Sequence, residues 1–206
     1  KSSNIKHLLA SLEQIRYEKE ASDPISIPIL SNQAFKGIFK KQSGNSPFYN
    51  SFTLRQYQKD GIRLIKEYKY HSSDHKDQQL EIVQLTRIYS IIANLISDLK
   101  FLETLQLSEV DTKLLKEKLN SINVKVDEIL ELFDNKDNHG ISLYLDKNLS
   151  IEIYLKRDSM VIRFKLKNNV TTIGYINDPF LINLYAKLMH FHDSISKIVY
   201  NVNEID

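Results

Sequence analysis

The sequence predicts an α+β fold: a mainly helical N-terminal two-thirds with a long helical hairpin, then a small antiparallel β-meander of three to four strands capped by a C-terminal helix. Three observations lead to this class. Apolar residues recur at helical spacing through residues 76–133, they alternate with polar residues after Gly140, and Asp178-Pro179 then provides a helix start. With 206 residues, 42% of them hydrophobic, the chain can bury a sizeable core.

Residues 1–75 predict a basic helical region with irregular linkers. The first segment is expected to form an amphipathic or coiled-coil helix, because its apolar residues are three or four positions apart: Ile5, Leu8, Leu12 and Ile15. Pro24 and Pro28 break this helix, so we expect residues 21–33 to be extended or irregular.

Two further helices are expected in this region, a short one over residues 33–41 and a longer one over 53–70. Gly61 lies inside the second expected helix and would destabilise it by about 1 kcal/mol relative to alanine, which weakens the prediction. Gly44 and Pro47 end the first, and the polar stretch 43–47 between the two helices has the composition of a linker.

Residues 76–139 predict an acidic, amphipathic helical hairpin. One helix is expected over 76–106, and a second begins near Ser108, whose sequence Ser-Glu-Val-Asp resembles a capping box. A short connection favours antiparallel packing of the two helices. Both apolar stripes are wide, which indicates burial on more than one side: Leu80, Val83, Ile88, Ile91, Ile92, Leu95, Leu99, Leu102 and Leu105, and Leu115, Leu119, Ile122, Val126, Ile129 and Phe133.

Residues 140–206 predict the β-meander and its covering helix. The strands are expected over 141–145, 149–156, 160–167 and 170–176, with the alternation that places one face of the sheet in the core and the other in solvent. The closing helix begins at Pro179, and residues 76–206 are expected to pack as one unit.

Composition excludes several classes of protein. The formal net charge of +2 conceals a basic first third with 12 basic and 7 acidic residues, followed by an acidic middle over 76–140 with 8 and 12. No disulfide or cysteine-based metal site is possible without Cys, and five scattered Gly do not form a phosphate-binding loop. No apolar run is long enough to span a membrane, and the first residues lack the apolar core of a signal peptide, so we expect an intracellular protein of the cytoplasm or nucleus.

A basic, aromatic-rich segment over residues 35–70 is the main candidate site. Four of its cations are three or four residues apart and would form a stripe on one face of the expected helix, where they could neutralise phosphates: Arg55, Lys59, Arg63 and Lys66. The alternative is an ordinary amphipathic helix whose aromatic residues pack inward. The residues assigned to nucleic-acid or acidic-partner binding are Lys36, Lys40, Lys41, Arg55, Lys59, Arg63 and Lys66.

A second basic patch is expected on the solvent face of the meander, where it could meet an acidic partner: Lys156, Arg163, Lys165 and Lys167. Charge that protects the sheet against edge-to-edge association is the alternative explanation.

Two histidine clusters are weak candidates for chemistry. The first contains His71, Asp74, His75 and Asp77, with the two histidines four residues apart, but its position at a helix boundary favours caps and turns over a metal site. The second, His190, His192 and Asp193, fits a polar helix face better than a catalytic group. We therefore expect no metal, no cofactor and no catalytic residues.

Two functions remain. The first is a non-catalytic protein–protein interaction module or assembly subunit, with a protein partner or homodimer expected because the apolar stripes exceed what one hairpin can bury. The alternative is a nucleic-acid-binding regulator that uses residues 36–70. An enzyme is the least favoured hypothesis, since no motif of catalysis is present.

Overall fold

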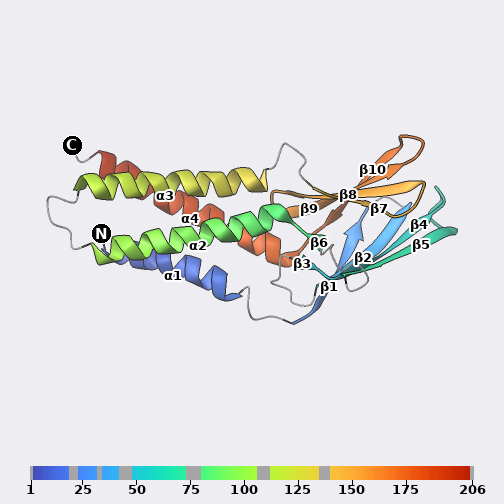
Figure 1. Ribbon diagram of the computed structural model, residues 1–206, viewed down its shortest axis with the longest axis horizontal. Coiled ribbons are helices and arrows are strands. Elements are labelled where there is room, and N and C mark those ends of the chain that lie inside the picture. Colours follow the sequence, from blue (N-terminus) through green and yellow to red (C-terminus); the bar gives the residue numbers. More distant parts are fainter. Residues whose placement is uncertain are drawn as a thin grey trace.

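A computed structural model describes residues 2–18, 23–31, 34–41, 48–72, 80–105, 112–134 and 140–204. Within these ranges the chain forms four long helices and an eight-stranded antiparallel sheet. The helices lie side by side at one end of the molecule and the sheet forms the other end (Figure 1). The predicted fold class is therefore wrong, because the N-terminal part supplies half of the sheet.

The helices are α1 (Ser2–Glu18), α2 (Val83–Thr104), α3 (Thr112–Phe133) and α4 (Pro179–Asn203). The first and third run toward the sheet and the other two run away from it, so that both chain termini lie at the far end of the bundle (Figure 1). Helix α1 packs on α2, α2 on α3, α3 on α4, and α4 on α1, which closes a four-helix bundle. The predicted hairpin is present as α2 and α3, but as half of this bundle.

The bundle buries the apolar stripes that led us to expect a partner chain. Leu12 of α1, Leu95 of α2 and Ile122 of α3 are each 0% exposed. These side chains pack against neighbouring helices of the same chain, as the antiparallel arrangement of amphipathic helices requires. The stripes are therefore no reason to expect a homodimer. None of the described helices is long and apolar enough to cross a membrane.

The sheet has the strand order β5-β4-β2-β1-β10-β9-β8-β7. Its N-terminal half comprises β1 (Ile25–Leu30), β2 (Phe35–Lys41), β4 (Ser51–Tyr57) and β5 (Leu64–His71); its C-terminal half comprises β7 (Ile141–Tyr144), β8 (Leu149–Lys156), β9 (Ser159–Leu166) and β10 (Thr171–Ile176). Each half is a four-stranded meander that a helix precedes and another helix follows. The two-residue strands β3 (Phe48–Tyr49) and β6 (Leu80–Glu81) pair separately.

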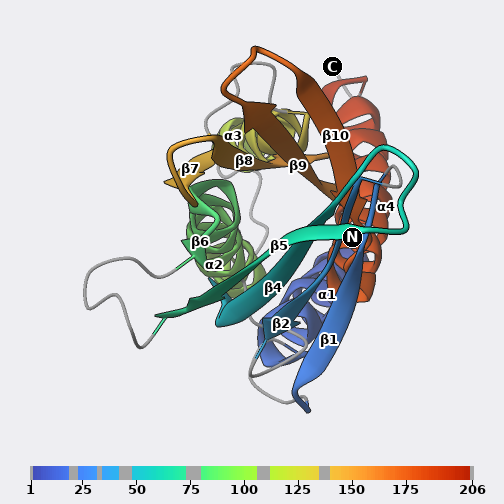
Figure 2. The ribbon, with the colours of Figure 1, turned by 90° about the vertical axis from the view of Figure 1, so that its right-hand side faces the viewer.

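The two meanders join through a short pairing of β1 with β10, in which Leu30 lies opposite Tyr175. The joined sheet curls, with the helices behind it (Figure 2). Its inner face carries the core, and the rings of Phe35 and Phe164, one from each half, stack across it with centroids 4.2 Å apart. A single apolar core therefore extends through the bundle and the inner face.

The expected helices over 33–41 and 53–70 are wrong, since these residues form β2, β4 and β5. Phe52 and Leu54 are buried while Thr53 and Arg55 point outward, so the true period is two. Gly61 has a φ of 70° in the turn between β4 and β5, a left-handed conformation that glycine adopts without strain. The C-terminal strands and the helix start at Asp178-Pro179 agree with the prediction.

Candidate interaction surface on the outer face of the sheet

The outer face of the sheet, which points away from the core, carries a strip of large exposed apolar side chains. Leu30 is 51% exposed, Tyr175 is 48% exposed, and the two lie directly opposite each other across the junction of the meanders. Ile38 on β2 lies opposite Pro28 of β1, and Ile173 is two positions before Tyr175 on β10. We name Leu30, Ile38, Ile173 and Tyr175 the apolar strip. The apolar strip spans three neighbouring strands, which distinguishes it from the single exposed hydrophobic residues that are common on protein surfaces.

Cations flank the apolar strip on the N-terminal side. Lys36 and Lys40 of β2, Arg55 of β4 and Lys69 of β5 all belong to the outward-pointing positions of their strands. We name these four residues the basic face. Lys36 lies directly opposite Arg55, so two positively charged residues occupy facing positions in the β2–β4 pair.

In the part of the chain that the structure describes, one carboxylate neutralises part of the basic face. Glu67 accepts a hydrogen bond from Arg55 Nε at 2.6 Å and lies 3.1 Å from Lys69 Nζ. The hydrogen bond from Arg55 and then the contact with Lys69 lower the pKa of Glu67. Lys36 lies over the ring of Tyr57, with its Nζ 5.0 Å from the centroid. Among the described residues, Lys40 has no carboxylate partner, so the basic face keeps a positive excess.

A hollow of about 480 Å³ lies over β4 at the end of the basic face. Lys40 borders it from β2, and Lys69 and His71 border it from β5. Ser51 and Thr53 of β4 lie between these two sides, because Ser51 pairs with both Lys40 and His71 and Thr53 pairs with Lys69. The hollow therefore combines hydroxyl groups with cations from two flanking strands, and Phe52 and Tyr70 complete its lining.

The other flank of the apolar strip also carries cations. Arg163 and Lys165 of β9 share the carboxylate of Glu152, each at 3.0 Å. Arg163 also lies over the ring of Tyr154. Lys156 and Lys167 are exposed at the two ends of the β8–β9 pair. The four residues of the second predicted patch are thus spread along the strands. Only Arg163 and Lys165 come together, at the carboxylate of Glu152.

The structure separates the seven cations assigned to nucleic-acid or acidic-partner binding, four of which were expected to form one helical stripe. Lys36, Lys40 and Arg55 lie on the outer face. Lys59 and Arg63 lie in the turn between β4 and β5. The backbone carbonyl of Arg63 accepts a hydrogen bond from the Gln58 N–H at 2.9 Å, which closes this turn. Two others, Lys41 and Lys66, point to the inner face. The expected stripe with steps of three and four residues does not form, because these residues are in strands.

Lys41 belongs to a buried polar cluster that joins the two halves of the chain. Its ammonium donates to the carboxylate of Asp178, which also accepts from Tyr49 Oη at 3.0 Å and from the Phe180 N–H at 3.0 Å. Lys41 and Asp178 are 2% and 0% exposed. We name Lys41, Tyr49 and Asp178 the core cluster. Burial lowers the pKa of the Lys41 ammonium despite the adjacent carboxylate, and burial together with Asp178 raises that of Tyr49.

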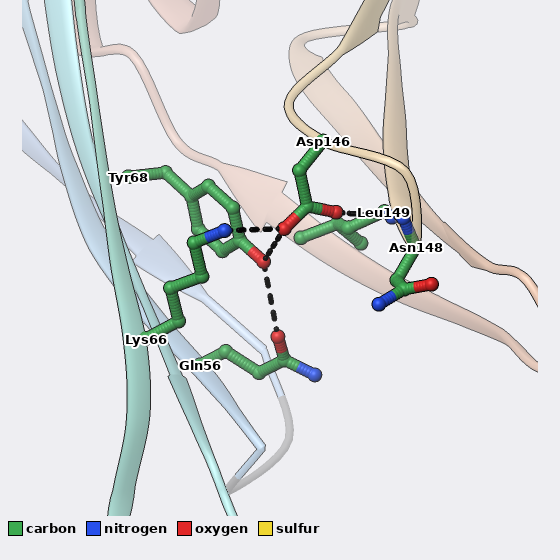
Figure 3. Close-up of polar contacts among 6 residues, drawn as sticks. All are labelled: Gln56, Lys66, Tyr68, Asp146, Asn148 and Leu149. Carbon is green, nitrogen blue, oxygen red and sulfur yellow. Dashed lines mark hydrogen bonds and ion pairs between the residues drawn. The ribbon is translucent and has the colours of Figure 1, made fainter.

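Lys66 belongs to a second cluster, which holds the two ends of the curled sheet together. Asp146, in the turn between β7 and β8, accepts from Lys66 Nζ at 2.6 Å and from Tyr68 Oη at 3.0 Å (Figure 3). We name Lys66, Tyr68 and Asp146 the rim cluster. The hydrogen bond from Lys66, with others from the Asn148 N–H and Tyr68, lowers the pKa of Asp146 to about 2. Burial, and then Asp146, raises the pKa of Tyr68 to about 12.

Among the described residues, no three or more His, Asp and Glu side chains come together where they could hold a metal ion. Asp74, His75 and Asp77 lie outside the described residues, so the structure places only His71 of the first histidine cluster. His192 lies between Asp127, at 3.1 Å, and Asp193, at 3.4 Å. His192 therefore connects α4 to α3 on the surface of the bundle, as a residue of a polar helix face does.

Sequence reasoning did not find the apolar strip. Two of its members are two positions apart in β10, and the others stand singly in β1 and β2. Only strand pairing brings Leu30 to Tyr175, which is 145 positions away in the chain. The alternation in residues 171–176 was the one available signal. A scan against models of known protein families finds no match for this chain, and no curated protein matches its sequence.

Proposed function

We propose that this chain is a non-catalytic protein-interaction module, and that the outer face of its sheet docks a segment of a partner protein that carries acidic and apolar side chains. The observation that carries the proposal is the apolar strip, exposed on three adjacent strands and flanked by cations on both sides. An apolar centre with a polar, charged rim is the usual anatomy of a protein-binding surface.

Charge selects the chemistry of the partner. The basic face holds four cations against Glu67, and the opposite flank holds Arg163 and Lys165 against Glu152. An acidic segment would meet complementary potential along both sides of the strip, which favours association and its orientation.

The polar clusters support a binding role over a catalytic one. The core cluster ties β2 and β3 to the start of α4, and the rim cluster ties β5 to the β7–β8 turn. Each thereby serves to join segments of the chain. The absence of cysteine fits a reducing, intracellular setting for such a module.

The test is selection of binders from a displayed library of random peptides. We expect the selected peptides to be rich in acidic and apolar residues. The variants Leu30→Ser and Tyr175→Ser should weaken their binding by about tenfold or more, since central apolar contacts carry most of the affinity. Val124→Ser is the control, because Val124 is an exposed apolar residue on α3, away from the sheet, and is 65% exposed.

The proposal fails if no peptide is enriched, or if enriched peptides bind the Leu30→Ser and Tyr175→Ser variants as tightly as the unaltered chain. Peptides that bind the Val124→Ser variant poorly would place the binding surface on the bundle and would equally contradict it.

Nucleic-acid binding is a second candidate function, which the four cations of the basic face favour. The aromatic residues that would stack on bases weaken it: Phe35, Phe39 and Phe52 are at most 2% exposed, and the rings lie in the core. Binding through phosphates alone would fall steeply with salt. Fluorescence anisotropy of a labelled oligonucleotide, single- or double-stranded, tests it: Arg55→Gln with Lys36→Gln should reduce affinity and its salt dependence, and unaltered binding would contradict it.

A further inference from the structure

We infer that the hollow over β4 is a subsite for a phosphoryl group, carried on a phosphorylated side chain of the docked partner segment. This inference rests on the proposed function, since it names the chemistry of one part of the partner. The hollow is bordered by Lys40, Lys69 and His71, with Ser51 and Thr53 between them.

The strand register brings these five side chains over one point. Lys40, Ser51 and His71 lie in one row across β2, β4 and β5, and Thr53 and Lys69 lie in the next outward-pointing row. Neighbouring strands are about 4.8 Å apart, so the two flanking strands are roughly 10 Å apart across β4. Flexible lysine side chains from both can converge above the two hydroxyls in the middle.

The charges favour an anion with several acceptor oxygens. Lys40 has no carboxylate partner among the described residues, and Lys69 shares Glu67 with Arg55. A phosphoryl group carries a charge of about −1.5 to −2 and three strong acceptor oxygens near neutral pH. It would use two ammonium groups and the two hydroxyls together, whereas a carboxylate offers two oxygens and one charge.

The hollow adjoins the apolar strip on the same face. Thr53, which lines the hollow, lies directly opposite Ile38 of the strip across the β2–β4 pair. A segment lying along the strip could therefore place an apolar side chain at Ile38 and a phosphorylated side chain in the hollow.

The test is a titration of the ¹⁵N-labelled chain, followed by ¹H–¹⁵N NMR, with O-phospho-L-serine, inorganic phosphate and N-acetyl-L-aspartate as separate probes. We expect saturable shifts of the amides of Ser51, Thr53 and Lys69 with O-phospho-L-serine. The double variant Lys40→Gln, Lys69→Gln should weaken this binding by about tenfold or more, because it removes both charge-assisted contacts.

The matched control is the double variant Lys113→Gln, Lys197→Gln, which removes the same charge from exposed positions on the helix bundle, outside the proposed binding surface. It should retain the affinity of the unaltered chain. If the Lys40, Lys69 double variant bound O-phospho-L-serine as tightly as this control, the two lysines would contribute nothing specific to binding. That result would overturn the subsite.

The three probes separate the sources of the anion. Binding of N-acetyl-L-aspartate as tight as that of O-phospho-L-serine would overturn the phosphoryl assignment, and binding of inorganic phosphate alone would overturn the assignment to a phosphorylated side chain. These outcomes concern the hollow only. The peptide selection with Leu30→Ser and Tyr175→Ser reports on the apolar strip, so the two proposals can fail separately.

Discussion

The ammonium of Lys41 and the carboxylate of Asp178 form a buried ion pair between residues that are 137 positions apart in the chain. Asp178 also caps the start of α4 through the Phe180 N–H. One side chain therefore sets where α4 begins and anchors that point to β2. Because a buried charge without a partner is unfavourable, the pair constrains how the two meanders are assembled.

Replacing Lys41 by methionine should strongly destabilise the fold. The substitution leaves the Asp178 carboxylate buried without its counter-charge, which typically costs about 3–5 kcal/mol in the free energy of unfolding. Urea denaturation followed by circular dichroism measures this loss. Lys40→Met, at the exposed neighbouring position, is the control and should change the free energy by less than about 0.5 kcal/mol. Equal stability of the two variants would contradict a structural role for the pair.

Asp146 should make the stability of the sheet depend on acidic pH. Its pKa is about 2 in the folded chain against an ordinary 3.8, so the folded state favours the ionised form. This contribution is fully present above about pH 4 and is lost as the pH falls toward 2. The difference in unfolding free energy between the unaltered chain and Asp146→Asn should therefore shrink between pH 5 and pH 2.

Urea unfolding of both proteins across that pH range is the measurement. Asp193→Asn is the control, because Asp193 is an exposed carboxylate on α4, and its small effect should not follow the same curve. A difference for Asp146→Asn that stays constant from pH 5 to pH 2 would show that the rim cluster does not hold the ionised carboxylate.

Gly37 is expected to tolerate no side chain. A Cβ placed there would lie 2.4 Å from the carbonyl oxygen of Thr53 and 2.8 Å from the side chain of Ile29. Gly37→Ala should therefore lower the free energy of unfolding by about 1–3 kcal/mol through overpacking. Thermal unfolding compares it with Ser26→Ala, at an exposed position of β1, which should be near neutral. A Gly37→Ala variant as stable as the unaltered chain would mean that β2 and β4 are farther apart.

Leu12 tests whether the bundle is closed within one chain. It is 0% exposed on α1, so Leu12→Ala should lower the free energy of unfolding by about 2–5 kcal/mol, while Val124→Ala should have little effect. Since the neighbours of Leu12 belong to the same chain, the melting temperature of the variant should not depend on protein concentration. A melting temperature that rises with concentration would indicate a seam between two chains.

The N-terminal half of the sheet shows why pattern alone was ambiguous. Phe35 and Phe39 are four apart and both are buried, which fits a helix as well as a strand. Lys36 lies between them, and further lysines and Gln56 lie in the neighbouring strands; both residue types favour helices. Pairing of β2 with β1 and β4 overrides those preferences, because it satisfies the backbone of three strands at once and buries a continuous inner face.

The candidate site was predictable only in part. The sequence indicated that residues 36–70 are basic, and the exposed cations of the basic face come from that segment. It gave no sign that Lys41 is in the core, because only the approach of Asp178 from the C-terminal half makes that burial tolerable.

By itself the sequence determined the local structure wherever one period or one cap dominated: the helices α1, α2, α3 and α4, and the cap at Asp178. Tertiary structure alone decided that the two meanders form one sheet, that the four helices close on each other, and that Leu30 meets Tyr175 on an exposed face. The physical reason is range. Periodicity and capping depend on neighbours a few residues away, whereas the junction of β1 with β10 joins segments at opposite ends of the chain, where burial of the shared core selects the pairing.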